Sequence, residues 1–358
     1  MLEHRLAALR QLLAEKNLDA ALITKEVNLH YFSGFRGDDT ALIVTPNAQF
    51  LITDNRYTEQ ASQQATTYTI IEQKKGLWHE VAEIIKKLGA KRIGFEGKNL
   101  TVDTFGRLQK ELGDAKLAVS LALDDLRQVK DAEEIACIRK ACKIADKAYE
   151  DVVKFIRPGI TEFAIAAHME NVMRELGSEG PSFATIVASG ARGALPHGTP
   201  TEKIIEEGDF VTMDYGAIYQ GYHSDITRTV CVGRASDRQR EVYARVLAAQ
   251  ELALTKIKPD VSGKSVDAAV REYLKKYDLA QYFGHGLGHS LGLEIHEEPR
   301  LSPKSTCEAL VPNMLITDEP GVYFAGKGGL RIEDTVLVTT TGAERLTKSA
   351  KELIEIGA

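Results

Sequence analysis

The stretch DFVTMDYGAIYQGYHSDITRTVCVG, residues 209–233, decides how the second half of the chain folds. Two apolar runs rich in β-branched and aromatic residues flank a tight turn at residues 219–221, which predicts a pair of antiparallel strands. If the first two turn residues form the loop, Asp214 lies directly opposite Asp225, with Cβ atoms about 5 Å apart. A three-residue loop would shift the register by one residue and put the two aspartates on opposite faces.

Two carboxylates at this distance repel each other, and burying them is costlier still unless a cation or a shared proton lies between them. The hairpin therefore indicates a divalent metal site. The inference depends on the turn, because only the two-residue loop brings both side chains to one face. Two solvent-facing aspartates are the alternative that this hairpin alone leaves open.

A second strand pair is predicted downstream, in LITDEPGVYF, residues 315–324, and LRIEDTVLV, residues 330–338. Glu319 and Glu333 are symmetric about Gly326 in the connecting loop. Each glutamate lies inside an apolar run where burial is expected, which makes a surface role less favourable. The aspartate beside each glutamate alternates to the other face, where we expect hydrogen bonds or solvent and no metal.

Three histidines gather in FGHGLGHSLGLEIHEEP, residues 283–299, as His285, His289 and His296. Glycines in this stretch expose the backbone and let side chains converge from an apolar wall. We expect one histidine to bind metal through a neutral imidazole and the others to donate protons or hydrogen bonds nearby. His197, in the loop SGARGALPHGTP, is a fourth candidate, for which a solvated loop residue is an equally good interpretation.

The four carboxylates and one histidine offer oxygen and nitrogen donors and no thiolate, a set that suits Mn²⁺, Co²⁺, Fe²⁺ or Zn²⁺. Two bridging carboxylates would hold two ions ~3.5–4 Å apart, a spacing at which a water is deprotonated near neutral pH. Such a water attacks a carbonyl group without a serine or cysteine nucleophile. The sequence therefore predicts a metal-assisted hydrolase.

The length of the chain, 358 residues, fits about two domains of roughly 150 residues each. Its formal net charge of −6 lacks the basic excess that binding a phosphate backbone requires, so nucleic acid is not an expected partner. The four cysteines form no CxxC pair, which favours a reduced, cytoplasmic setting. Neither a secretory signal nor a run of ~18 apolar residues occurs, so a membrane is not an expected partner either.

Residues 1–125 alternate helical and strand periods, as an α/β domain does, and contain no dense cluster of possible ligands. Helices are predicted at residues 2–16, 55–64 and 77–88, and strands at residues 19–24, 40–45, 49–53, 67–71 and 91–96. We expect this domain to support or gate chemistry done elsewhere. A charged linker then leads into a long helix with Asp131 as N-cap and Glu134 three residues on, which places the domain boundary at about residue 125.

A faint internal repeat is visible in residues 126–358. RPGITEFAIAAHMENVMRELG, from Arg157, aligns without a gap with KPDVSGKSVDAAVREYLKKYD, from Lys258. In each copy a proline, a turn residue and a hydroxyl cap precede a patterned helix, although chance is the alternative because many helices start this way. A genuine repeat implies two similar halves that face each other across a pseudo-two-fold axis.

Five motifs resemble those of the pita-bread metallopeptidases. They are ALPHG and, downstream of it in this order, MDYGAIYQGYHSDITRT, HGLGHSLGLEIHEEP, TDEPGVY and LRIEDT. Within that family the chain is most similar to the aminopeptidase P and prolidase branch, over essentially its whole length. The resemblance implies an α+β fold. A creatinase-type α/β domain is expected at residues 1–125 and a pita-bread catalytic domain with pseudo-two-fold halves at residues 126–358.

The resemblance also implies a role for each site residue. The metal ligands would be Asp214 on one ion, Asp225 and Glu333 between both ions, and His289 with Glu319 on the other. The substrate-binding and proton-handling positions would be held by His197, His285 and His296, with Arg331 beside the ligands and Glu319 as a proton shuttle. Two ions are expected, with Mn²⁺ as the first choice and Co²⁺, Zn²⁺ or Fe²⁺ as alternatives.

By this resemblance we expect an Xaa-Pro aminopeptidase of the aminopeptidase P type, which removes the residue that precedes a proline in second position. The alternative is an Xaa-Pro dipeptidase, or prolidase, which must bind a carboxylate directly after proline. A non-catalytic peptide-binding module of the same fold is a poorer match because all five ligands are present. The expected partners are proline-containing peptides and a second copy of the chain in a homodimer.

Overall fold

The computed structural model describes residues 2–358, which form two compact units, one ending at Arg127 and the other beginning at Gln128. Each unit has its own sheets and its own hydrophobic core. No helix among residues 2–358 is both long and apolar enough to cross a membrane.

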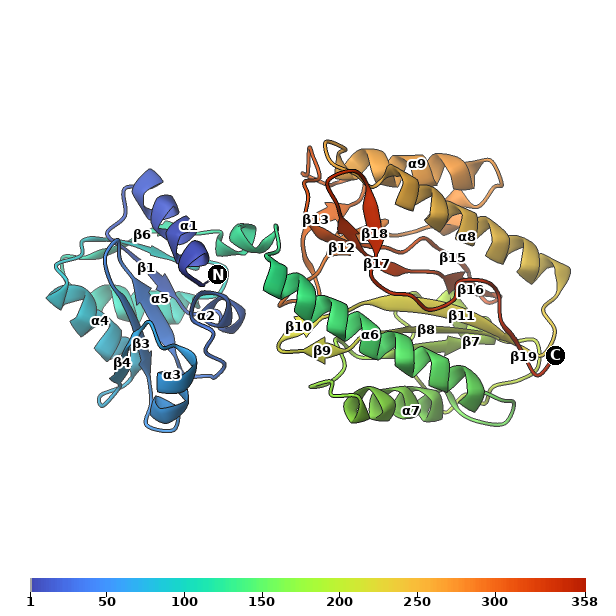
Figure 1. The fold of residues 1–358 in the computed structure, drawn as a ribbon, viewed down its shortest axis with the longest axis horizontal. Helices are drawn as coiled ribbons and strands as arrows, with labels where there is room; N and C mark the ends of the chain where they lie inside the picture. Colours follow the sequence, from blue (N-terminus) through green and yellow to red (C-terminus); the bar gives the residue numbers. More distant parts are fainter. Residues whose placement is uncertain (1) are drawn as a thin grey trace. The chain divides into compact units, whose positions relative to one another are not determined.

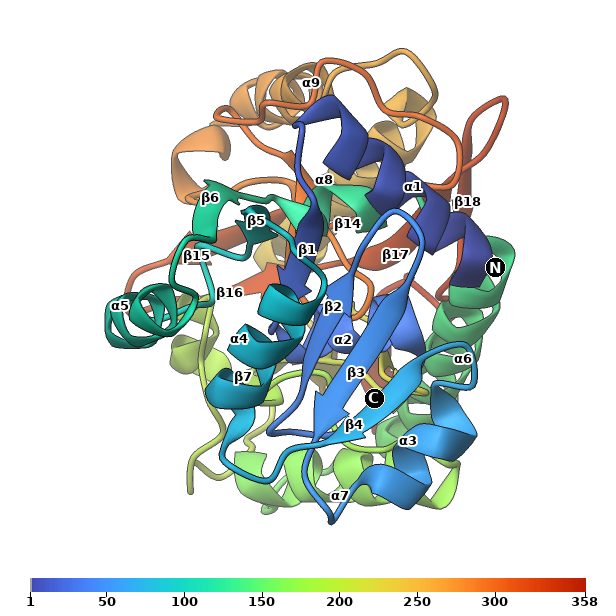
Figure 2. The ribbon, with the colours of Figure 1, turned by 90° about the vertical axis from the view of Figure 1, so that its left-hand side faces the viewer.

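The first unit is an α/β domain built on a six-stranded mixed sheet. The strand order is β4 (Thr69–Glu72), β3 (Gln49–Thr53), β2 (Ala41–Val44), β1 (Ala20–Ile23), β5 (Arg92–Phe95) and β6 (Lys116–Ser120). Every residue of β1 and β2 is buried, because helices cover both faces of the sheet. Figures 1 and 2 show two of these helices, α4 (Leu77–Lys87) and α2 (Glu26–Ser33), on opposite faces.

The elements predicted for this unit are all present. Beyond them, the structure contains β6, α2 and α5 (Val102–Glu111), and the predicted first and second helices are α1 (Leu2–Glu15) and α3 (Thr58–Gln64). A short 3₁₀ helix at Leu123–Arg127 ends the unit. The capping box predicted for the next helix is confirmed, since Asp131 accepts from the backbone of Glu134 and the Glu134 carboxylate accepts from the backbone of Asp131.

The second unit consists of two helix pairs that flank several small sheets, as Figure 1 shows. The helices are α6 (Ala132–Phe155) with α7 (Glu162–Glu175), and α8 (Asp237–Lys256) with α9 (Gly263–Lys275). The four-stranded sheet has the order β19 (Glu355–Ile356), β11 (Ile226–Val232), β8 (Phe210–Tyr215) and β7 (Ile186–Ser189). The three-stranded sheet has the order β14 (Leu315–Asp318), β17 (Asp334–Val338) and β18 (Ala343–Arg345). Three two-stranded sheets pair β9 (Ile218–Tyr219) with β10 (Tyr222–His223), β12 (Gly288–Ser290) with β13 (Glu297–Leu301), and β15 (Gly321–Phe324) with β16 (Gly328–Arg331).

The internal repeat is visible in the structure. Helix α7 follows the N-cap Thr161 and helix α9 follows the N-cap Ser262, and each cap accepts from the backbone three residues on. Two residues before each cap the chain has a positive φ, at Gly159 and at Asp260. Each helix pair packs into its own core, α6 and α7 with the four-stranded sheet and α8 and α9 with β14, β16 and β17. The two halves of the unit are therefore built alike.

The predicted pairing of Asp214 with Asp225 was wrong, because Asp214 lies opposite Thr227. The two-residue loop consists of Gln220 and Gly221, one position further along than predicted. Both loop residues have positive φ, 50° and 80°, as a type I′ turn requires, and glycine accepts this conformation without steric cost. The resulting register shift is two residues, so the two aspartates keep the same face although they are not direct partners.

The second hairpin has the predicted register. Every residue pair of β14 with β17 and of β15 with β16 is symmetric about residue 326. The ladder is interrupted where Glu319 and Glu333 lie, between these two pairs of strands. Their backbone N–H groups instead donate to the carbonyl groups of Leu287 and Thr227, at 2.8 and 3.1 Å. The interruption thus ties this hairpin to the two other segments that carry predicted ligands.

Candidate metal centre

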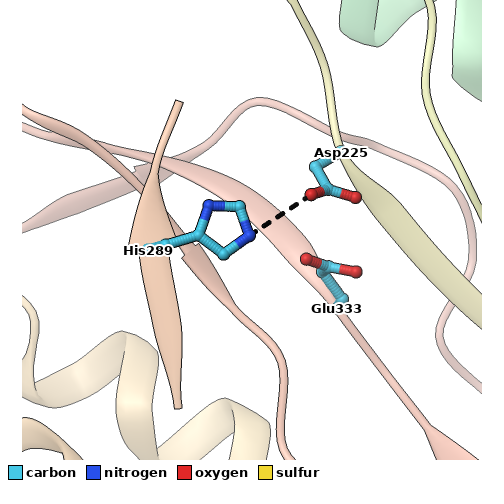
Figure 3. A group of neighbouring side chains, drawn as sticks. All are labelled: Asp225, His289 and Glu333. Carbon is cyan, nitrogen blue, oxygen red and sulfur yellow. Dashed lines mark ion pairs between the residues drawn. The ribbon is translucent and has the colours of Figure 1, made fainter. Parts of the chain in front are cut away.

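The centre of the second unit holds two carboxylates and an imidazole that point toward one another. Figure 3 shows Asp225, which precedes β11, Glu333, which precedes β17, and His289 on β12. One ligand atom from each residue lies within 4.8 Å of the others, and all three residues are buried. The His289 Nε2 atom is 3.5 Å from Asp225 Oδ2, the contact drawn as a dashed line.

The other two predicted ligands adjoin this cluster. Glu319, directly after β14, places Oε1 3.6 Å from His289 Nε2. Asp214, on β8, forms a buried ion pair with Arg331, and its charge acts on Asp225, Glu319 and Glu333. The structure therefore brings the five predicted ligands together.

The donor set fits divalent cations. Asp214 Oδ1 and Asp225 Oδ1 are buried and have no hydrogen-bond partner among residues 2–358. A buried carboxylate oxygen without a donor is unfavourable, and a cation removes that cost. The Nδ1–H group of His289 donates to the carbonyl of Ser290 at 3.0 Å, which leaves the lone pair of Nε2 facing the carboxylates.

The protonation of the carboxyl groups reflects their crowding. Burial raises the pKa of Asp225 well above its ordinary value, and the charges of Glu333 and Asp214 raise it further. Burial also raises the pKa of Glu333, with further contributions from Glu319 and Asp214. The pKa of Glu319 rises to about 8 for the same main reason, although Arg331 opposes the rise. Without a cation, the cluster therefore retains protons near neutral pH.

The histidines respond in the opposite direction. Burial lowers the pKa of His289 to about 3 and that of His285 to about 4. Burial, followed by the charge of Arg300, lowers the pKa of His296. Neutral imidazoles are the form that binds metal and exchanges hydrogen bonds with a substrate.

A hydrogen-bonded chain links Arg331 to His285. Arg331 Nη1 donates to the Tyr323 hydroxyl at 2.6 Å, and the hydroxyl lies 2.9 Å from His285 Nε2. Because His285 Nδ1 is 2.8 Å from the carbonyl of Gly286 and must donate to it, Nε2 accepts from the tyrosine. The chain holds His285 in one tautomer beside Glu319, whose Oε2 is 4.0 Å from Nδ1.

The remaining predicted site residues lie at the exposed edge of the cluster. The ring of His296 is 4.4 Å from that of His289, and His296 is itself exposed. His197 is exposed on the loop after β7, near enough for its charge to act on His285 and His296. The carbonyl of Pro196, next to His197, accepts from Arg331 at 3.2 Å. All nine predicted site residues thus belong to one neighbourhood.

Behind the ligands, the aspartates beside the two glutamates form a buried network. Asp318 lies opposite Asp334, and both side chains are fully buried. Gln250 donates to both carboxylates, at 3.1 and 3.0 Å, and Arg228 pairs with Asp334 at 2.7 Å. Of the two sequence-based interpretations of these aspartates, hydrogen bonding is therefore correct and solvent exposure is wrong.

Several residues of the site were not predicted. Thr227 donates to Glu333 at 2.6 Å and Thr317 to Glu319 at 3.1 Å, so each hydroxyl orients a ligand. Strand alternation could have found both, because each threonine lies two residues from a ligand in a predicted strand. No such signal marks Tyr323 or Arg300, because the position of each side chain relative to the ligands is set by the pairing of its strand with another.

The comparison with protein families identifies both units. Residues 136–340 match the model of metallopeptidase family M24, and residues 5–129 match that of the creatinase/prolidase N-terminal domain. The chain belongs to metallopeptidase family M24. Membership confirms the predicted enzyme class, the pita-bread fold of the second unit and the creatinase-type fold of the first.

Similar M24 proteins cover almost the whole chain. An Xaa-Pro dipeptidase of Pyrococcus furiosus is 40% identical over an alignment of 359 positions, which covers 99% of this chain and 100% of the relative. The structure of an Xaa-Pro dipeptidase from Bacillus anthracis matches with a TM-score of 0.96 at 42% identity, covering 99% of both chains. The structure of an X-Pro aminopeptidase from Thermotoga maritima matches with a TM-score of 0.91 at 38% identity, covering 98% of this chain and 99% of the other.

Gly288→Ala is expected to weaken metal binding roughly tenfold or more. A Cβ atom at Gly288 would lie 2.0 Å from the backbone oxygen of Thr317, so β12 would have to move and take His289 with it. Calorimetric titration with Mn²⁺ or Zn²⁺ measures the change. Gly284→Ala is the matched control, because nothing lies within 4 Å of its Cβ position. Equal affinities in the two folded variants would contradict this role of the close approach.

The metal-free M24 protein is expected to lose stability as the pH rises from 6.5 to about 8. The pKa of Glu319 is raised from 4.5 to about 8 in the folded protein. Between these pH values the folded protein keeps a proton that the unfolded chain has lost, so its stability falls as the pH rises toward 8. The lowered pKa values of His289 and His285 act in the opposite direction below pH 6.5 and not above it. Thermal denaturation of chelator-treated protein across this range measures the effect.

Two further measurements isolate the source of this pH dependence. Glu319→Gln should weaken it, because the substituted side chain no longer titrates, whereas Asp225 and Glu333 still do. Saturating Mn²⁺ should stabilise the protein more as the pH rises, since the cation competes with protons for the same oxygens. A metal-free melting temperature that climbs from pH 6.5 to 8 would show that the carboxyl groups are not protonated as described.

Proposed function

We propose that the chain is an Xaa-Pro dipeptidase. The observation that carries the proposal is the 40% identity to a protein of that name over 99% of this chain, together with the converging ligand set. The aminopeptidase P activity expected from the sequence is less well supported, because relatives named Xaa-Pro dipeptidase recur among the most similar sequences and structures. Both activities share the same ligands and chain length, so those features could not separate them.

The proposed centre holds two divalent ions, with Mn²⁺ the first choice and Co²⁺, Zn²⁺ or Fe²⁺ the alternatives. Asp225 and Glu333 would lie between the ions, Asp214 would complete one site, and His289 with Glu319 the other. When bound, the ions supply an activated water and polarise the carbonyl group of the bond to be cleaved. Soft ligands are missing from the set, which favours these metals over Cu⁺.

The surrounding side chains would bind the peptide and move its protons. His296 and His197 are exposed at the edge of the cluster and can donate hydrogen bonds to the peptide. Glu319, whose Oε2 atom lies 4.0 Å from His285 Nδ1, is the proposed carrier of a proton toward the leaving proline nitrogen. The proline amide has no N–H group, so a compact apolar pocket suits it better than backbone pairing.

A dipeptidase also needs a cation for the carboxylate that follows proline. Arg300 on β13 lies opposite His289, and its charge acts on His289, His296 and Glu319. Its side chain is 46% exposed, so it is accessible to a ligand, and its neighbour Glu298 is 3.4 Å away. We assign the recognition of the dipeptide carboxylate to Arg300. The homodimer stays a prediction.

The substrate test compares an Xaa-Pro dipeptide with the matching Xaa-Pro-Xaa tripeptide, after chelation and separate restoration of Mn²⁺, Co²⁺ or Zn²⁺. We expect turnover of the dipeptide in at least one metal form and little turnover of the tripeptide. Preferential cleavage of the tripeptide would instead favour the aminopeptidase P activity.

The same assay tests Arg300. Arg300→Met should raise the KM for the dipeptide roughly tenfold or more, because a charge-assisted hydrogen bond contributes about 1.5–3 kcal/mol. A C-terminally amidated Xaa-Pro substrate, which lacks the carboxylate, should respond much less. Arg238→Met, at a 64% exposed arginine on α8, is the control. Equal losses for the acid and the amide would contradict the assignment.

A further inference from the structure

Glu162, the first residue of α7, is fully buried although it lies outside the metal centre. Its carboxylate accepts five hydrogen bonds. Oε1 accepts from the backbone and hydroxyl groups of Ser189, both at 2.8 Å. Oε2 accepts from the backbone and hydroxyl groups of Thr201, at 3.1 and 2.8 Å, and from the guanidinium of Arg192.

Four of these five donors lie at the two ends of one loop, and the fifth, from Arg192, lies within it. Ser189 is the last residue of β7, and Thr201 follows the segment that carries His197. Arg192, within the loop, also donates to the carbonyl of Thr199 at 2.8 Å. One buried carboxylate therefore closes residues 190–200 into a loop with a fixed base.

The start of helix α7 does not itself require this glutamate. The repeat places Gly263 at the corresponding position of α9, and that helix begins in the same way after its cap. A Cβ atom at Gly263 would lie 2.3 Å from the carbonyl oxygen of Arg300, so the second half uses this position for a close backbone contact. The glutamate in the first half thus serves the loop and not the helix.

The loop delivers a side chain to the metal centre. Its Pro196 carbonyl accepts from Arg331, which pairs with Asp214, and His197 follows directly. Within the loop, Leu195 and Gly198 donate to the carbonyls of Arg192 and Leu195, at 2.9 and 3.1 Å. Such local bonds give a shape to the segment. Its attachments to the rest of the unit are the carboxylate of Glu162 at its base, the bond from Arg331 to Pro196, and the close approach of Gly190 and Gly193 to β16.

We propose that Glu162 is a positioning residue for substrate binding, because it fixes the base of the loop that presents His197 to the peptide. The proposal rests on the proposed function, in which His197 contacts the substrate. A residue can change substrate affinity without touching the substrate if it holds a binding side chain in place. When the loop is already ordered in the free protein, binding loses less conformational entropy.

Glu162→Gln is the principal variant, since it keeps the size of the side chain but leaves one acceptor oxygen for five donors. We expect amide hydrogen exchange in residues 190–200 to accelerate in the metal-loaded protein. The KM for an Xaa-Pro dipeptide should rise roughly tenfold, with kcat and metal content nearly unchanged. Glu170→Gln on the same helix is the matched control, because Glu170 accepts from Thr185, outside the loop, at 2.7 Å.

A double-mutant cycle separates positioning from general stability. In a His197→Ala background, Glu162→Gln should raise the KM no further, because the loop then has no histidine to present. A purely structural role would give additive losses and would overturn the proposal. Unchanged exchange of residues 190–200 in Glu162→Gln, or faster exchange with an unchanged KM, would overturn it as well.

A second variant covers the case in which Glu162→Gln does not fold. Thr201→Val removes one donor and should give a smaller rise in loop exchange and in KM, whereas Thr201→Ser, which keeps the hydroxyl, should restore both. A Thr201→Val protein indistinguishable from Thr201→Ser would overturn the proposal. If the wild-type protein does not hydrolyse Xaa-Pro dipeptides, the proposed function fails, while the exchange measurements still decide whether Glu162 orders the loop.

Discussion

The buried carboxylates of the second unit place the strongest constraint on this structure. Asp225 and Glu333 are buried beside each other, with Asp214 and Glu319 close enough to raise the pKa of both. A protein tolerates such a cluster only with protons or cations between the oxygens. Protons suffice near neutral pH, as the raised pKa values indicate, but Asp214 Oδ1 and Asp225 Oδ1 still have no hydrogen-bond partner among residues 2–358. The architecture around the cluster follows from the need to hold these groups in place until cations bind.

The backbone meets this need by breaking its ladders at the ligands. Between β14–β17 and β15–β16, the amides of Glu319 and Glu333 leave their own hairpin and bond to the segments before β12 and within β11. Arg228, also on β11, pairs with Asp334 behind the ligands. Three ligand-bearing segments are thus tied together by main-chain and buried ionic contacts, which limits how far one ligand can move without the others.

Sequence patterns predicted this centre well because its ligands occur in short, strongly patterned strands. The symmetry of Glu319 and Glu333 about residue 326 is correct, and the strand period kept Asp214 and Asp225 on one face even though the turn was misplaced. The pattern could not locate the turn because glycine is favourable at more than one position of a tight turn.

Residues that depend on tertiary contacts were beyond the reach of sequence patterns. Glu162 reads as an ordinary first-turn glutamate of a helix, and its five donors come from residues 27 to 39 positions away. Arg300 and Tyr323 likewise acquire their partners through strand pairing. The ligand motifs and the chain length are common to both activities, so they could not decide between dipeptides and longer substrates.

We propose that the carboxylate cluster binds two divalent ions. Anomalous diffraction from crystals grown with Mn²⁺, recorded on both sides of the manganese absorption edge, tests it most directly. We expect two anomalous peaks ~3.5–4 Å apart, both within bonding distance of Asp225 and Glu333. A single peak, or peaks away from these two carboxylates, would contradict it.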